Sequence, residues 1–499
     1  MTSGPSAPLP ATVGETHISV LVGIGDCVYK LKKPVAMGFL DFSTRQAREA
    51  ACHREVELNR RLAPDVYLGV ADVLGVDGQP CDHLVVMRRM PDARRLATLV
   101  RQGRAVDDEL RELAHLIATF HASAPTSRAI SNAATAARVR GNWDNSFEEL
   151  REFVGPVLDE SACDRVESLV HRYIDGRRAL FDLRIDEGRI RDAHGDLQAE
   201  DIFCLDDGPR VLDCIEFNDN LRYCDVLADV GFLAMDLERL GSPDLGRRFL
   251  SLYRELSGET YPQSLADHYI AYRAHVRAKV ACLRYAQGDL GAAATASSLL
   301  GLTLDHLERA RVVLAVVGGL PGTGKSTLAM GIADARGWSL LRSDEVRKDV
   351  AGLGHADRAD APFAEGIYRP EMTDATYRTL LGRARQALEL GESVVLDASW
   401  SDASWRRRIA DLAVETTSDV VELRCVVPAD VAARRMASRA ATGSDPSDAT
   451  PAVAATMAAT ADAWPSAATI DTSGTREESL AKAMAALGLS LGTGDRRTS

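Results

Sequence analysis

The pattern of apolar and polar positions predicts an N-terminal part in which strands precede helices. Residues 17–35, HISVLVGIGDCVYKLKKPV, contain two β-branched runs broken at GIGD and predict a β-hairpin. Residues 43–64, STRQAREAACHREVELNRRLAP, have helical spacing between a Ser start and a Pro stop, and predict a helix. HLVVMRRM then predicts a strand and DDELRELAHLIATFHAS a helix. This order predicts a two-lobed α+β domain.

The pattern changes at Val312, where RVVLAVVGGLPGTGKST predicts a short buried strand, a Gly-rich loop and a helix. Four further segments carry apolar runs of the same kind: SLLRSDEVRK, ESVVLDASW, VVELRCVV and ATIDTSG. Strands that alternate with helices predict an α/β domain with a parallel sheet covered on both faces. We therefore expect one domain over residues 1–307, a second over 308–490 and a flexible tail over 491–499.

Composition and charge narrow the class of protein. The 499 residues are 46% hydrophobic and 26% charged, as in a globular protein. A formal charge of −13 disfavours a broad electrostatic grip on nucleic acid or anionic membrane. Nine cysteines without a C-x-x-C pair favour reduced thiols. With no apolar run long enough to span a bilayer, we expect a cytoplasmic protein without a membrane partner.

A phosphate-binding motif lies in the second part. GLPGTGKST, residues 319–327, satisfies G-x-x-x-x-G-K-[ST], the Walker A pattern, between a predicted strand and a predicted helix. Such a loop points backbone N–H groups at phosphates, its lysine reaches the β- and γ-phosphates, and its hydroxyl is placed for Mg²⁺. The predicted ATP-binding residues of this loop are Gly319, Gly322, Thr323, Gly324, Lys325, Ser326 and Thr327, with Ser326 also a metal ligand.

Other charged residues follow the remaining predicted strands of this part. Asp344 and Arg347 form D-x-x-R, in which the carboxylate could accept a hydroxyl proton and the arginine hold an anionic substrate group. Asp397 ends an apolar strand, where a Walker-B acid holds Mg²⁺. Arg435 and Arg439 lie four apart and could close over ATP phosphates. Ordinary surface charge is the alternative for each.

Residues 312 to about 489 resemble small P-loop kinases of the zeta toxin, chloramphenicol phosphotransferase and gluconate kinase kind. The resemblance rests on the Walker A loop, D-x-x-R, Asp397 and the segment RMASR. It implies that Asp344 is the catalytic base and that Arg435 and Arg439 belong to a lid. Polynucleotide 5′-kinases share D-x-x-R, so that activity stays an alternative, which the acidic charge disfavours.

The segment HGDLQAEDIF, residues 194–203, indicates a second phosphotransferase site. Kinase catalytic loops read H-x-D and then, after four residues, Asn; here Asp196 is the predicted base, and Asp201 stands where Asn would bind metal. Asp213 ends a predicted strand and is a second predicted metal ligand. Lys30 on a strand and Glu55 on a helix predict the lysine–glutamate pair that binds ATP phosphates.

These parts, in this order, resemble the aminoglycoside phosphotransferase family, whose loop is usually H-G-D followed by Asn. The resemblance implies ATP and Mg²⁺ as cofactors, Lys30 and Glu55 at the phosphates, Asp196 as base and Asp213 as metal ligand. Lys32 projects from the same strand face as Lys30 and competes for its role. With KLKKPVAMGFLDFST and RYCDVLADVGFLAMDL, the whole chain resembles a bacterial two-domain family that fuses such a domain to an AAA-type or zeta toxin-like ATPase.

Two charged groups leave their roles open. Arg273 and Arg277, one helical turn apart with Lys279 near them, could line a pocket for an anionic substrate or form a solvated helix face. An acidic cluster could hold a cationic aminoglycoside-like ligand, although a structural role is favoured for Asp225 and Asp229. Its members are Asp225, Asp229, Asp236 and Glu238.

The sequence as a whole predicts two fused ATP-dependent kinase modules that phosphorylate hydroxyl groups of small molecules, such as sugars, aminosugars or nucleotide sugars. The rival hypothesis is a nucleotide-binding regulator, in which the first lobe binds ATP without transfer because Asp201 replaces Asn. The sequence does not identify the acceptors, the coupling between domains or the oligomeric state.

Overall fold

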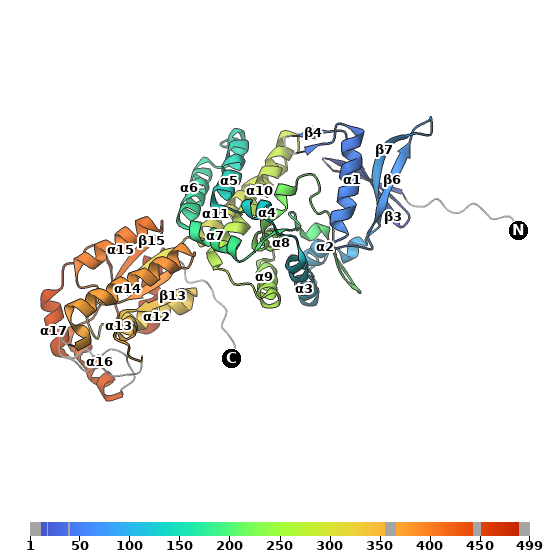
Figure 1. Ribbon diagram of the computed structural model, residues 1–499. Helices are drawn as coiled ribbons and strands as arrows, with labels where there is room; N and C mark the ends of the chain where they lie inside the picture. Colours follow the sequence, from blue (N-terminus) through green and yellow to red (C-terminus); the bar gives the residue numbers. More distant parts are fainter. Residues whose placement is uncertain (1–10, 17, 38–39, 355–365, 443–450, 489–499) are drawn as a thin grey trace. The chain divides into compact units, whose positions relative to one another are not determined.

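The computed structural model describes residues 11–16, 18–37, 40–354, 366–442 and 451–488 (Figure 1). The chain forms two compact units. Unit 1 comprises Met1–Glu167, Phe181–Tyr261 and Ala266–Leu307, and unit 2 comprises Ser168–Leu180, Pro262–Leu265 and Glu308–Ser499. The expected tail over 491–499 lies outside the described residues, and the boundary between residues 307 and 308 stays a prediction.

Unit 1 begins with an antiparallel five-stranded sheet in the order β1-β2-β3-β7-β6. The predicted hairpin is confirmed: Ile24 of β2 pairs with Cys27 of β3 across Gly25 and Asp26, and Gly25 has φ 59°. The strands are β1 (Ala11–Glu15), β2 (Ser19–Ile24), β3 (Cys27–Lys32), β6 (Tyr67–Leu74) and β7 (Pro80–Arg88), beside a short pair, β4 (Ala36–Met37) and β5 (Leu40–Asp41).

Helix α1 (Arg45–Asn59) packs its apolar face on this sheet. It begins after Thr44, whose hydroxyl accepts a hydrogen bond from the Ala47 amide at 3.1 Å and caps the helix. Cys52 and Val56, one turn apart, share a core with Val85 and Met87 of β7. Glu55 lies on the same side and is fully buried. The packing therefore places a carboxylate under the sheet.

Residues 92–309 are mainly helical, as predicted, and the N-terminal part has the predicted two-lobed α+β fold. Two short antiparallel pairs interrupt the helices: β8 (Ile190–Asp192) with β11 (Tyr223–Asp225), and β9 (Ile202–Leu205) with β10 (Gly208–Val211). The helices are α2 (Leu96–Arg101), α3 (Asp107–Ser123), α4 (Arg128–Asn132), α5 (Ala136–Leu150), α6 (Glu160–Gly176), α7 (Arg178–Asp186), α8 (Val226–Arg239), α9 (Pro243–Ser257), α10 (Gln263–Ala286) and α11 (Ala292–Arg309). Short 3-10 turns include η3 (Ala199–Asp201) and η4 (Asp219–Leu221).

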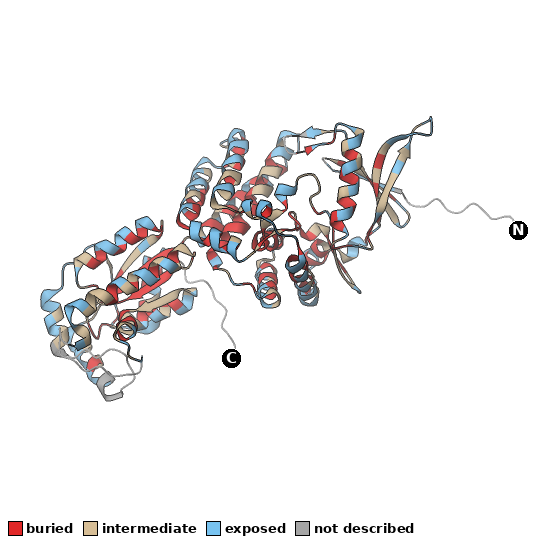
Figure 2. Ribbon diagram, in the orientation of Figure 1, coloured by how far each residue is buried: buried red, intermediate tan, exposed pale blue. Residues whose placement is uncertain are grey.

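Unit 2 contains the predicted parallel sheet, in the order β13-β14-β12-β15-β16. Every residue of the central strand β12 is buried, so both of its faces are covered (Figure 2). The Gly-rich loop leaves the carboxyl end of this strand. The strands are β12 (Val313–Gly318), β13 (Ser339–Arg342), β14 (Val394–Asp397), β15 (Asp419–Val426) and β16 (Ala468–Asp471).

Helices α12 and α18 share one core with the sheet of unit 2, through Leu328, Ile332 and Met484 among others. The helices of this unit are α12 (Lys325–Arg336), α13 (Ser343–Ala351), α14 (Pro370–Glu389), α15 (Ala403–Glu415), α16 (Ala429–Thr442), α17 (Pro451–Thr460) and α18 (Arg476–Ala486), with the 3-10 turn η5 (Gly366–Tyr368). Within the described ranges, neither unit contains a helix with the length and apolarity to cross a bilayer.

Candidate functional site

A network of buried charges joins β3 to α1 in unit 1. The Lys30 ammonium lies 2.8 Å from Glu55 Oε1 and 2.6 Å from Asp213 Oδ1. The Lys32 ammonium lies 2.7 Å from Glu55 Oε2 and also pairs with Glu216. Burial opposes the charge on Lys30, yet Asp213 and Glu55 raise the pKa of this lysine well above its ordinary value. Glu55 is therefore shared by both lysines, and Lys30 alone also contacts Asp213.

Side chains of helix α8 hold the loop that carries Asp196. The Asp229 carboxylate accepts hydrogen bonds from the backbone amides of His194 at 3.0 Å and Gly195 at 2.8 Å, and contacts His121 Nε2 at 3.1 Å. Two helical turns further along α8, Asp236 accepts a hydrogen bond from the Ala199 amide at 3.0 Å. Both aspartates are fully buried. They act as structural anchors of the loop, as favoured for Asp229 from the sequence.

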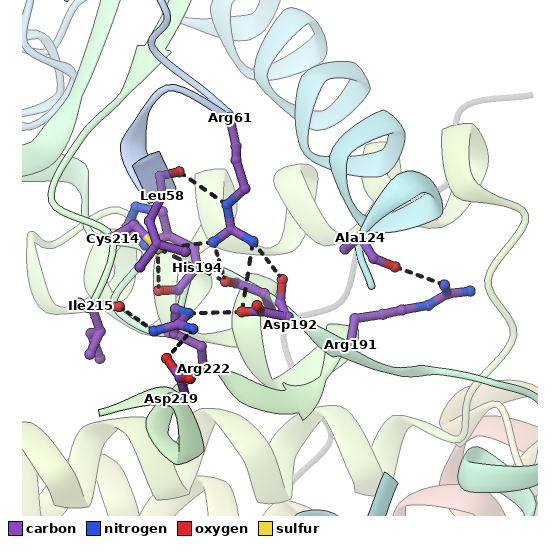
Figure 3. Close-up of polar contacts among 12 residues, drawn as sticks. Leu58, Arg61, Ala124, Arg191, Asp192, His194, Cys214, Ile215, Asp219 and Arg222 are labelled. Atoms are coloured by element: carbon purple, nitrogen blue, oxygen red, sulfur yellow. Dashed lines mark hydrogen bonds and ion pairs between the residues drawn. The ribbon is translucent and has the colours of Figure 1, made fainter. Parts of the chain in front are cut away.

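Two arginines connect this loop to the segment around Asp213 (Figure 3). Arg61 donates to the carbonyl oxygens of Asp192 at 3.0 Å and Ala193 at 3.1 Å. Arg222 donates to Asp192 Oδ1 at 2.8 Å and to the Ile215 carbonyl at 2.7 Å. The strand residues before His194 and the residues after Asp213 are thereby tied together, which fixes the spacing of the two predicted functional segments.

Asp196 has the environment expected of a proton acceptor. Its Oδ2 accepts a hydrogen bond from the side-chain Nε2 of Gln198 at 2.8 Å. Burial raises the pKa of Asp196 to about 6, with Arg277 opposing the rise. A carboxyl group with a pKa near neutrality can both take up and release a proton at physiological pH.

The two predicted metal ligands of unit 1 differ in electrostatic state. Burial, and then the charges of Asp213 and Asp196, raise the pKa of Asp201 well above its ordinary value. Lys30 lowers the pKa of Asp213, against the effect of burial. Asp213 has a φ of 65°, a conformation that costs energy outside glycine, and its amide donates to the Tyr67 hydroxyl at 3.1 Å. The Asp213 side chain is 47% exposed, so an ion can reach it.

Nothing in the described ranges groups three or more acidic, histidine or cysteine side chains into a protein-only metal site. Kinase magnesium takes few protein ligands, because nucleotide phosphates and water complete its octahedral shell. Asp201 and Asp213 supply hard oxygen donors of the type that Mg²⁺ prefers. The donor set therefore fits a nucleotide-borne Mg²⁺.

The Gly-rich loop of unit 2 is shaped by close approach of other backbone. A Cβ on Gly319 would lie 2.7 Å from the Cys425 carbonyl, and one on Gly322 would lie 2.7 Å from the Ala432 carbonyl. Thr323 closes the turn by donating to the Leu320 carbonyl at 2.8 Å. Beside the loop lies a pocket of about 560 Å³. Its lining includes Gly322, Gly324, Lys325, Ser326, Thr327, Arg435 and Thr472.

Arg435 is tied to the loop through a threonine at the end of β16. It donates to the Thr472 carbonyl at 2.7 Å, while the Thr472 hydroxyl donates to the Thr323 carbonyl at 2.6 Å. Arg435 thus faces the pocket from a fixed position. The side chain of Arg439 lies outside the described residues, so its predicted role stays a prediction.

The two predicted acids of unit 2 lie at the carboxyl ends of neighbouring strands. Burial raises the pKa of Asp344, with Lys325 opposing and Asp397 adding to the rise. Asp397 Oδ2 accepts from Arg342 at 3.2 Å, while its buried Oδ1 has no hydrogen-bond partner in the part of the chain that the structure describes. A buried carboxylate oxygen left in this state fits the water shell of Mg²⁺.

Arg347 stands one helical turn after Asp344 on α13. Its Nη1 donates to the Ile367 carbonyl and the Thr373 hydroxyl, both at 3.1 Å, and its guanidinium lies 5.0 Å from the Tyr368 ring. Its buried Nε makes no hydrogen bond to any described residue. The side chain is therefore held in place with a donor still available for the predicted anionic group.

Sequence reasoning missed several members of these sites. Glu216 completes the pairing of Lys32, Gln198 contacts the predicted base, and Thr472 joins Arg435 to the Gly-rich loop. A partial signal existed for Thr472, because it follows the last strand at the carboxyl edge of the sheet, where ligands bind in such folds. Glu216 gave no signal, since its partner lies far away in the sequence.

Comparison with known proteins now adds to this geometry. A family model described as an AAA domain matches residues 314–464. The uncharacterized proteins Rv2004c of Mycobacterium tuberculosis and Mb2027c of Mycobacterium bovis are each 44% identical over 471 residues, which is 94% of this chain and 94% of theirs.

Solved structures match each unit separately. The GDP complex of aminoglycoside 2′-phosphotransferase-IIIa is 16% identical, covers 62% of this chain and 93% of its own, and has a TM-score of 0.38. A gluconokinase from Sinorhizobium meliloti 1021 is 21% identical, covers 35% of this chain and 91% of its own, and has a TM-score of 0.25.

The lysine network generates a first prediction about stability. Lys32→Met should lower the free energy of unfolding by about 3 kcal/mol, because it leaves the buried Glu55 and Glu216 carboxylates short of a countercharge. Lys33→Met is the matched control: Lys33 pairs with Glu15, which is 70% exposed, and such pairs contribute little. Urea unfolding of the full chain measures both variants. Equal midpoints for the two would show that the Lys32 pairs do not stabilise the fold.

Proposed function

We propose that this chain, which belongs to the same family as the mycobacterial proteins Rv2004c and Mb2027c, is an ATP-dependent phosphotransferase with two active sites. Each site transfers the γ-phosphoryl group of ATP to a hydroxyl group of a small molecule. The observation that carries the proposal is the Walker A loop, with Lys325 and Ser326 facing a pocket at the helix N-terminus.

In the N-terminal site, Asp196 accepts the proton of the acceptor hydroxyl as that oxygen attacks the γ-phosphorus, and the bond from this phosphorus to the β,γ-bridging oxygen breaks to release ADP. Lys30 offsets the negative charge of the phosphates, and Glu55 fixes its position through the 2.8 Å ion pair. Asp201 and Asp213 would hold Mg²⁺, which supplies further charge stabilisation when it is bound. No covalent intermediate on the protein is needed.

In the C-terminal site, Asp344 is the proton acceptor and Lys325 stabilises charge on the transferred group. Ser326 and Asp397 would hold Mg²⁺, and Arg347 binds an anionic group of the acceptor. Arg435 closes the phosphate side of the pocket. Sugars, aminosugars or nucleotide sugars are the proposed acceptor class for the two sites.

The test of this function uses γ-labelled ATP and pooled cell metabolites. Lys325→Ala should lower label transfer by the C-terminal site on the order of a hundredfold, because one charge is lost where the transferred group carries its own. Asp344→Asn should still bind ATP but lose the products of the C-terminal site only, and Asp196→Asn should remove the products of the N-terminal site only. Lys482→Ala, which changes an exposed lysine of the same unit, is the control. Release of free phosphate without any labelled product would favour the nucleotide-binding regulator instead.

The pKa of Asp196 sets the pH dependence of the N-terminal site. Only the carboxylate form accepts a proton, so a pKa of about 6 leaves about a tenth of the enzyme active at pH 5. We expect kcat/KM of the Lys325→Ala chain to be level above pH 7 and to fall about tenfold for each pH unit below pH 6. A profile that stays level down to pH 5 would exclude Asp196 as the base.

Asp201 should make ATP binding unusually dependent on magnesium. With metal bound, the second carboxylate adds a negative charge that tightens Mg²⁺ binding; without metal, it repels the γ-phosphate. In the Lys325→Ala background, Asp201→Asn should therefore weaken the magnesium dependence of ATP affinity, as measured by calorimetric titration at several magnesium concentrations. An unchanged dependence would remove Asp201 from the metal site.

A further inference from the structure

Arg273 and Arg277 of helix α10 differ in their contacts. Arg273 is buried and donates to the carbonyl oxygens of Ala228 and Gly195, each at 3.0 Å. Gly195 directly precedes Asp196, so this contact fixes α10 beside the loop that carries the proposed base. Arg273 is thereby committed to the fold and has few donors left for a ligand.

Arg277 lies one helical turn further along the same face of α10. Among the residues that the structure describes it forms no ion pair and no hydrogen bond. Its neighbours on the helix are paired: Lys279 lies 2.7 Å from Glu149, and Arg284 lies 2.6 Å from Asp289. Arg277 is also the strongest charge opposing the effect of burial on the pKa of Asp196, as expected of a residue on the helix that contacts the loop through Arg273.

Three members of the acidic cluster, Asp225, Asp229 and Asp236, are engaged within the protein. Asp225 forms a two-point ion pair with Arg184, at 2.7 and 2.8 Å. Asp229 is occupied by the loop amides and His121, and Asp236 by the Ala199 amide and Arg239. A polycationic acceptor would meet Arg277 without a countercharge, at a cost that like charges always carry at close range.

We propose that the acceptor of the N-terminal site is an anionic small molecule, with a phosphate or carboxylate group near the hydroxyl that is phosphorylated, and that Arg277 binds this group. The guanidinium fork matches both anions in two-point geometry. The anion would sit beside Asp196, so that binding it also positions the hydroxyl against the base. The inference rests on the phosphotransferase function of this unit and names the chemical class of its substrate.

The experiment separates a metabolite extract into anionic, neutral and cationic fractions and incubates each with γ-labelled ATP and the Lys325→Ala full chain, in which the C-terminal site is silent. Labelled product is expected from the anionic fraction alone. Arg277→Gln should raise KM for that acceptor at least about tenfold and leave KM for ATP unchanged, with Arg277→Lys in between. Arg284→Gln, on the same helix and 53% exposed, should change neither constant.

Product from the neutral or cationic fraction alone, or an unchanged acceptor KM in Arg277→Gln, would overturn the anionic class while leaving phosphoryl transfer in place. Absence of labelled product from every fraction would overturn the phosphotransferase function of unit 1, and the acceptor class with it. The control is the thermal unfolding midpoint of the Arg277→Gln chain. If it equals the midpoint of the parent chain, a raised KM reports weaker acceptor binding rather than loss of fold.

Discussion

The N-terminal site depends on one buried carboxylate, that of Asp229. It accepts two consecutive backbone amides, of His194 and Gly195, at 3.0 and 2.8 Å, and contacts His121. Each amide left without this partner in the interior would cost about 1–3 kcal/mol. Burial disfavours the charge, yet the hydrogen bond from His121 and the charges around it lower the pKa of Asp229 below its ordinary value. The stabilisation is therefore present above the unfolded-state pKa of about 3.9 and is lost as the pH falls toward the folded value.

The two units assemble the groups proposed to bind phosphate from different parts of the chain. Unit 2 gathers its proposed phosphate-binding groups from one continuous loop, whose backbone amides and Lys325 are neighbours in sequence. Unit 1 gathers them from β3, α1 and the segment after β10, where Lys30, Glu55 and Asp213 meet within 2.8 Å. The first arrangement needs glycine where Cys425 and Ala432 approach, and the second needs buried ion pairs held by a shared glutamate.

This difference explains how much of each site could be predicted from the sequence. The Walker A loop and the strand–helix alternation were readable, because contiguous residues carry them, and the hairpin, α1 and parallel sheet were found as expected. Lys30, Glu55 and Asp213 were predicted only from their order and a family resemblance. Lys32 shares Glu55 across 23 positions of sequence and pairs with Glu216 across 184 positions, and no local pattern encodes either contact. Likewise, the free state of Arg277 depends on which acids the fold has already used.

Charges of opposite sign surround the proposed catalytic loop, residues 194–203. Asp201 and Asp213 are both carboxylates, and the charge of Asp213 adds to burial in raising the pKa of Asp201. Lys30, which pairs with Asp213, opposes this rise. Arg277 of α10 is the strongest charge opposing the effect of burial on the pKa of Asp196. A cation bound with the nucleotide would neutralise Asp201 and Asp213, and an anionic group on the acceptor would neutralise Arg277. Under the proposed function, Asp201 and Arg277 each meet an opposite charge that one of the two substrates brings.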